Sequence, residues 1–205
     1  TFALSLGIGL AYKQLFAGAN LLPGHQLGTL GGAVVGVLVY DFCHYWYHRS
    51  AHRFDTLWRL GHQMHHSAES LDPWGAYFLH PLDAAFFLTL SNVMLYPVLG
   101  LTPLAGAGAS AVITFCAVFQ HARLATPRWL GFLVQRPESH AVHHARGVHA
   151  FNYANLPLWD LVFGTLQNPA TGRPRPAVGF YEGASRRIAA MLAFRDVSTR
   201  SREQT

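Results

Sequence analysis

Three long apolar stretches run along the first two thirds of the chain, at residues 27–47, 77–101 and 103–119. The first carries one charged residue, Asp41, near its end, and the second carries Asp83 near its start. Each stretch is close to the roughly 20 residues that a membrane-spanning helix needs. The pattern therefore predicts three membrane-spanning helices, with buried helices of a large soluble protein as the alternative. Residues 1–26 hold a further apolar stretch, interrupted by Lys13, which we expect to be a partial membrane or interfacial segment.

Composition agrees with a membrane protein. Charged residues make up 12% of the 205 residues, about half of what a soluble domain usually carries. The net charge is +5, but the basic residues form no run, which argues against nucleic-acid binding. Arginines follow the first and the third apolar stretch, at positions 49, 53, 59, 123, 128 and 136, whereas the link YPVLGLTP between the second and third has no charge. The positive-inside rule then places both Arg-rich ends in the cytoplasm.

Histidine is the side chain that stands out in this apolar background. HQMHH at residues 62–66 and HAVHH at residues 140–144 share one spacing, and HYWYH at residues 44–48 pairs two further histidines. On a helix, positions i, i+3 and i+4 share a face. Each segment therefore points its imidazoles roughly the same way, and the three segments gather eight of them on the predicted cytoplasmic side: His44, His48, His62, His65, His66, His140, His143 and His144.

The number and spacing of these histidines predict a metal site. Neutral imidazole binds zinc, copper, iron and nickel, and eight ligands are too many for one ion but suit two. The last two histidines of each HxxHH segment diverge by about a third of a turn, so they can reach different metals. Neither an ExxH nor an HExxH motif accompanies the segments. Asp41, one turn before His44, could orient a ligand by hydrogen bonding.

Four longer segments, two of which include histidines named above, follow one another along the chain: DFCHYWYHRSAH (41–52), LWRLGHQMHHS (57–67), HPLD (80–83) and NYANLPLWDLVFGT (152–165). In this order the chain resembles the fatty acid hydroxylase and sterol desaturase superfamily over residues 27–166. The resemblance implies a non-haem centre of two iron ions, O₂ as co-substrate, and a lipid substrate such as a sterol, a fatty acyl or an alkyl chain. Hydroxylation and desaturation both stay open.

The same resemblance adds candidates around the eight histidines. It implies that His121, His52 and His80 are further possible metal ligands, and that Asn152 and Asp160 are structural or support the ligands. No segment resembles a cytochrome b5 domain, so we expect a separate electron donor, such as a cytochrome b5-like protein, a ferredoxin or a reductase. His25 and His149 show no ligand spacing. We expect His25 to be a bystander and His149 to be a hydrogen-bonding or interfacial residue.

The predicted fold is all-α: a polytopic membrane helical bundle with a helical cap on the cytoplasmic side that holds a dimetal site. The expected regions are an N-terminal segment (1–26), a catalytic domain (27–166) and a cytoplasmic tail (167–205) that is polar and mobile from Arg186. Three alternatives remain at this point: a haem protein, a metal transporter, and a zinc-dependent lipid hydrolase. Haem or transport would favour polar groups within the spans, which the third apolar stretch lacks apart from Ser and Thr.

Overall fold

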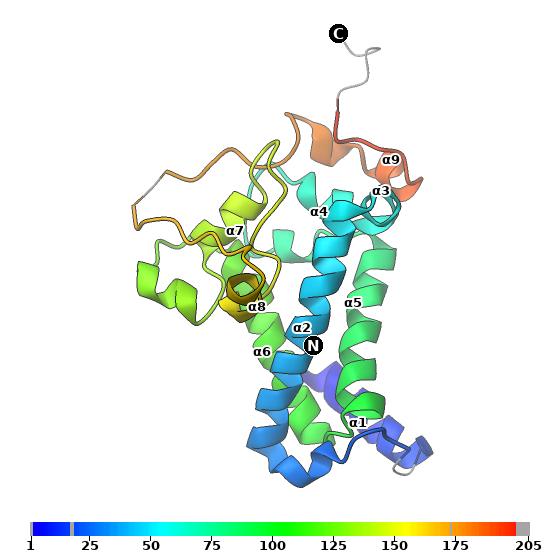
Figure 1. Cartoon of the computed structure of the whole chain (residues 1–205). Helices are drawn as coiled ribbons and strands as arrows, with labels where there is room; N and C mark the ends of the chain where they lie inside the picture. The colour runs from blue at the N-terminus through cyan, green and yellow to red at the C-terminus, as the bar shows by residue number, and fades with distance from the viewer. Residues whose placement is uncertain (1, 17–18, 173, 200–205) are drawn as a thin grey trace. The chain divides into compact units, whose positions relative to one another are not determined.

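The regular structure of the described residues is almost entirely helical, as predicted. The computed structural model describes residues 2–16, 19–172 and 174–199. Its α-helices are α1 (Phe2–Phe16), α2 (Gly28–Arg53), α3 (Asp55–Leu57), α4 (Gln63–His66), α5 (Pro81–Val93), α6 (Pro103–His121), α7 (Pro137–His143), α8 (Pro157–Val162) and α9 (Ile188–Leu192) (Figure 1). Within these residues the only β-type pairing is an isolated antiparallel bridge between Ala145 and Val178.

Three of these helices are long and apolar enough to cross a membrane, at residues 24–53, 81–98 and 103–121. The second begins later than the apolar pattern predicts, because Pro81 occupies its first turn and His80 Nδ1 accepts the backbone N–H of Leu82 at 3.1 Å. A proline at the first helical position and a side-chain acceptor just before it are both signals of a helix start. A π-helical turn at Met94–Val98 prolongs this helix, and Gly100 then turns the chain with φ +66°.

The chain forms two compact units, the first made of residues 1–44 and 86–116 and the second of residues 45–85 and 117–205. In the first unit, α1 packs on Tyr96, whose hydroxyl donates to the Ser5 carbonyl at 2.6 Å. Gly9 and Gly106 make this contact possible, because a Cβ at either position would lie within 2.6 Å of the Tyr96 ring. Close approach of helices at small residues is typical of membrane proteins.

The second unit contains the C-terminal segment, and here the expectation of a mobile tail from Arg186 is wrong for the described residues. Met191 and Val197 are fully buried in one apolar cluster with Met64. The Gln63 side chain ties the segment down further, since its oxygen accepts the Val197 N–H at 3.1 Å and its nitrogen donates to the Arg195 carbonyl at 3.0 Å. Apolar burial, roughly 25 cal/mol per Å², outweighs the polar composition of this stretch.

Candidate metal centre

The second unit brings nine histidines into two clusters. Within each cluster, the candidate ligand atoms lie within 4.8 Å of one another. The first cluster consists of His48, His52, His62, His66 and His143. The second consists of His65, His121, His140 and His144. The rings of His66 and His144 stack between the clusters, with centroids 4.1 Å apart.

Local structure explains how the sequence fills both clusters. The last turns of α2 provide His48 and His52 at i and i+4, and the last residue of α6 provides His121. A π-helical turn at Trp58–His62 leads into α4, and α7 ends in the second HxxHH segment. Adjacent histidines in each segment separate between the clusters: His65 from His66, and His143 from His144. The divergence of sequence neighbours on a helix accounts for this division.

Five of the clustered imidazoles are buried and held neutral. Burial, followed by repulsion from neighbouring imidazoles, lowers the pKa of His65, His66, His140, His143 and His144 well below the ordinary 6.5. Only neutral imidazole offers a lone pair to a metal. The environment therefore keeps these side chains in the protonation state of a ligand.

The ring nitrogens converge in both clusters in a way that fits a metal. In the first cluster, Nε2 of His52, His62, His66 and His143 is buried without a hydrogen-bond partner. In the second, Nε2 of His121 lies 3.2 Å from that of His65 and 3.1 Å from that of His140. His121 Nδ1 lies 2.7 Å from the Ala117 carbonyl, so it carries the proton and leaves Nε2 as a lone pair. Buried polar atoms normally have partners, and a cation at the centre of each cluster would supply one.

Asp83 orients a histidine of the first cluster. Its Oδ2 accepts His62 Nδ1 at 3.0 Å, and its Oδ1 accepts the Tyr47 hydroxyl at 2.7 Å. A carboxylate on the far nitrogen fixes the tautomer and raises the basicity of the ligand nitrogen. Gly61 allows this approach, because a Cβ there would lie 2.8 Å from the Asp83 Cβ. The acid was visible in the HPLD segment, but no local spacing paired it with His62.

Two backbone carbonyls orient further histidines. His48 Nδ1 donates to the Tyr153 carbonyl at 2.6 Å, and His143 Nδ1 donates to the Phe151 carbonyl at 2.7 Å. Phe151 and the following Asn152 both adopt left-handed backbone conformations, with φ of 69° and 51°. Such conformations are costly for residues other than glycine, so the surrounding contacts must hold this loop in place.

Asn152 and Asp160, which the resemblance marks as supporting residues, hold that loop. The Asn152 side chain donates to the carbonyls of Ser139 and Gln167 at 2.8 and 3.0 Å. The fully buried Asp160 accepts the backbone N–H groups of Tyr153 and Ala154, both at 2.8 Å, and the Thr165 hydroxyl at 2.6 Å. Neither residue touches a clustered histidine in these bonds, so each acts through the loop.

The remaining sequence candidates lie elsewhere. His44 and Asp41 belong to the first unit, where the His44 ring packs against Tyr40 and Phe87. His44 is in neither cluster of the described residues, and its role as a ligand stays a prediction. His80 is likewise outside both clusters and packs against the Phe194 ring at 5.3 Å while it starts α5.

His149 contacts a histidine of the first cluster, which fits the expectation of a hydrogen-bonding residue. Its Nδ1 lies 3.1 Å from His66 Nδ1, and its ring packs between Trp58 and Phe180. Burial, followed by repulsion from His62, lowers the pKa of His149 to about 4. The five-residue distance from His144 matches no ligand spacing, so sequence alone gave no signal for this contact.

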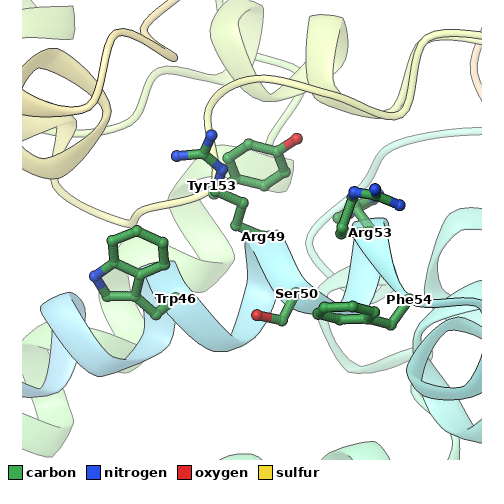
Figure 2. A pocket seen from close by; sticks show the side chains of 7 residues that line it. Trp46, Arg49, Ser50, Arg53, Phe54 and Tyr153 are labelled. Carbon is green, nitrogen blue, oxygen red and sulfur yellow. The ribbon is translucent and has the colours of Figure 1, made fainter.

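A cavity of about 460 Å³ borders the first cluster. Its lining consists of Trp46, Arg49, Ser50, His52, Arg53, Phe54 and Tyr153 (Figure 2). His52 belongs to the first cluster, and the Tyr153 ring packs against His48, His52 and His143 with centroids 5.5–5.7 Å apart. The cavity therefore gives a small molecule access to the edge of the first cluster.

Comparison with known proteins agrees with this arrangement. A family model described as fatty acid hydroxylase matches residues 33–165. The chain is 31% identical over 148 residues to ornithine lipid hydroxylase OlsE of Rhizobium tropici, covering 70% of this chain and 43% of that protein. It is 30% identical over 153 residues to alkylglycerol monooxygenase of Homo sapiens, with 71% and 32% covered. Sphinganine C4-monooxygenase 1 of Arabidopsis thaliana is 26% identical over 136 residues, with 64% and 52% covered.

The chain thus spans about a third to a half of the length of these three relatives. No solved structure matches it.

Proposed function

Because this chain belongs to the fatty acid hydroxylase family, we propose that it is a membrane-bound, O₂-dependent enzyme that hydroxylates or desaturates a C–H bond of a lipid. The observation that carries the proposal is the pair of buried histidine clusters with converging ring nitrogens, which in the first cluster lack hydrogen-bond partners. The relatives named for ornithine lipid, alkylglycerol and sphinganine support a lipid as the substrate class. Three apolar helices support a membrane location.

We propose two iron ions as the cofactor, one in each cluster. When bound, iron together with O₂ supplies the oxidising power that an unactivated C–H bond requires and that acid–base side chains lack. Seven of the eight histidines expected as ligands lie in the clusters, and His52 and His121 join them. His44 and His80 stay weaker candidates.

The chain itself holds, orients and shields this centre. Nine imidazoles offer lone pairs, and Asp83 together with the carbonyls of Phe151 and Tyr153 fixes the tautomer of three of them. Near-complete burial of most clustered rings keeps bulk water away from the reaction, which suppresses side reactions. The lipid would reach the centre through the cavity beside His52.

Topology and electron supply complete the proposal. The Arg-rich segments after the first and third membrane helices favour a cytoplasmic location for the clusters. A separate electron donor, a cytochrome b5-like protein, a ferredoxin or a reductase, would then approach from the water side. Exposed arginines would favour an acidic donor surface.

One histidine from each cluster tests the proposal. Purified protein should contain close to two irons per chain and oxidise a lipid only with O₂ and a reductant. His65→Ala and His143→Ala should each abolish oxidation and lower the iron content, whereas exposed His25→Ala should change neither. Retained oxidation in either cluster variant, a haem spectrum, or full activity with zinc and without O₂ would contradict the proposal.

A further inference from the structure

We propose that the cavity beside His52 is a headgroup site that selects lipids carrying an oxyanion, such as a phosphate, through Arg49 and Arg53. This inference rests on the proposed function and narrows its substrate class. Its basis is the combination of two guanidinium groups, a ring-lined wall and a metal-cluster histidine in one cavity of about 460 Å³. That volume is within the range of small-molecule sites.

The lining of the cavity is positively charged, although Arg49 also interacts electrostatically with the buried Asp160, which does not line it. Two of the seven lining residues are arginines and none is acidic. Among the described residues, neither Arg49 nor Arg53 forms a salt bridge, and Asp55, the acid nearest to them in sequence, pairs with Arg59 instead. Arginine carries its charge at any relevant pH and its planar donors match the oxygens of phosphate and carboxylate.

The two arginines lie on the same side of α2. They are four residues apart near the end of α2, so they lie one turn apart on the same helix face. Arg49 is held in position, because its Nη1 donates to the Tyr45 hydroxyl at 2.9 Å and its guanidinium lies over the rings of Tyr45 and Trp46. Figure 2 shows both side chains extending from the side of α2 on which Tyr153 lies.

The rest of the lining suits the part of a lipid next to its headgroup. Trp46 and Phe54 are exposed large aromatic residues that line the same cavity. His52 and Tyr153 connect the cavity to the first cluster. A lipid anchored by its oxyanion at Arg49 and Arg53 would therefore have its adjoining carbons bordered by aromatic rings and its reacting region close to His52.

Arg53 gives the cleaner test, because Arg49 also stabilises neighbouring rings. Equilibrium binding would be measured in a nonionic detergent with 1-oleoyl lysophosphatidate and with 1-oleoylglycerol, which share the acyl chain and differ in the phosphate. We expect the wild-type protein to prefer the phosphate lipid by about tenfold, roughly 1.4 kcal/mol. Arg53→Gln should lose this preference and Arg53→Lys should restore most of it. Arg59→Gln, which removes an exposed arginine outside the cavity, should keep the full preference.

Several outcomes would overturn the headgroup site: equal affinity for the two lipids in the wild type, an unchanged preference in Arg53→Gln, or the same loss in Arg59→Gln. Competition by inorganic phosphate at the concentrations at which the lipid binds would overturn a lipid as the source of the oxyanion. Iron content is measured on the same samples. Two irons without headgroup preference would refute only the headgroup site, whereas a preference without iron would refute only the proposed function.

Discussion

Replacement of Asp83 by asparagine isolates the electrostatic contribution of a residue that does not itself belong to either cluster. The Asp83 carboxylate accepts His62 Nδ1 at 3.0 Å and the Tyr47 hydroxyl at 2.7 Å. In Asp83→Asn, the amide oxygen can still accept from His62, and the amide nitrogen can donate to the Tyr47 oxygen. The shape and both contacts are kept, so the variant should fold, but the negative charge behind His62 is lost.

The expected magnitude follows from the role of such partners. Loss of a group that orients a ligand histidine typically costs 10–100-fold in metal affinity, which is about 1.4–2.8 kcal/mol. Asp83 hydrogen-bonds one histidine of the first cluster, His62, and the substitution preserves this hydrogen bond. We therefore expect a loss near tenfold at the first cluster and a smaller change at the second.

Anaerobic titration of the metal-free protein with Fe²⁺ against a competing chelator measures both affinities. Wild-type protein should bind two ions, and Asp83→Asn should show one binding step weakened by about tenfold. Asp55→Asn is the matched control, because Asp55 is exposed and pairs with Arg59. Equal affinities in Asp83→Asn and wild type would refute the idea that this carboxylate tunes His62, and equal weakening of both steps would point to a general structural defect.

Three further predictions concern the scaffold. Gly61→Ala places a Cβ 2.8 Å from the Asp83 Cβ and should destabilise the protein by about 1–3 kcal/mol. Thermal unfolding measures this loss. Gly108→Ala is the control, because its Cβ would meet an ordinary contact at 3.6 Å. Asp160→Asn turns an amide donor toward a backbone N–H that needs an acceptor, so it should cost about 1–3 kcal/mol and speed hydrogen exchange in residues 151–154; unchanged exchange would contradict the role given to Asp160. Burial raises the pKa of Glu69, but hydrogen bonds from Ser185 and Gly183 outweigh it and leave the pKa below the ordinary 4.5. The stabilisation that the ionised Glu69 side chain gives the folded chain is then present above pH 4.5 and is lost as the pH falls through the lowered value. Residues 183–197 should therefore loosen in acid. Glu69→Gln should show the loosened state already at pH 7, and hydrogen exchange measures both effects.

The candidate membrane helices were predictable because their signal is local. Length and the near absence of charge predict each one, and the structure has three helices that are long and apolar enough to cross a membrane. Hydropathy did not predict where the second of these helices begins. Tyr77 and Phe78 count as apolar and extend the predicted stretch, but Pro81 and His80 determine the start of the helix. The C-terminal helix was missed for a different reason: Met191 is buried against Met64, more than 120 residues away in sequence, and no local pattern reports such a contact.

The histidine site was predictable in its members more than in its arrangement. The i, i+3, i+4 spacing indicates which imidazoles share a face, but it does not tell which ones meet across segments. His52 and His121 enter the clusters through the geometry of long helices. The carbonyls that orient His48 and His143 have no side-chain signature at all, because any residue supplies a backbone oxygen.

The division of the two HxxHH segments makes the clusters interdependent. The first of these segments sends His62 and His66 to one cluster and His65 to the other, and the second divides in the same way. A single short helix therefore holds ligands of both clusters in fixed relation, and the stacked rings of His66 and His144 leave little room for one cluster to move alone. Because interiors are close-packed, truncating a whole imidazole should disturb both clusters, whereas a change of charge that keeps every atom in place, as in Asp83→Asn, should act mainly on one.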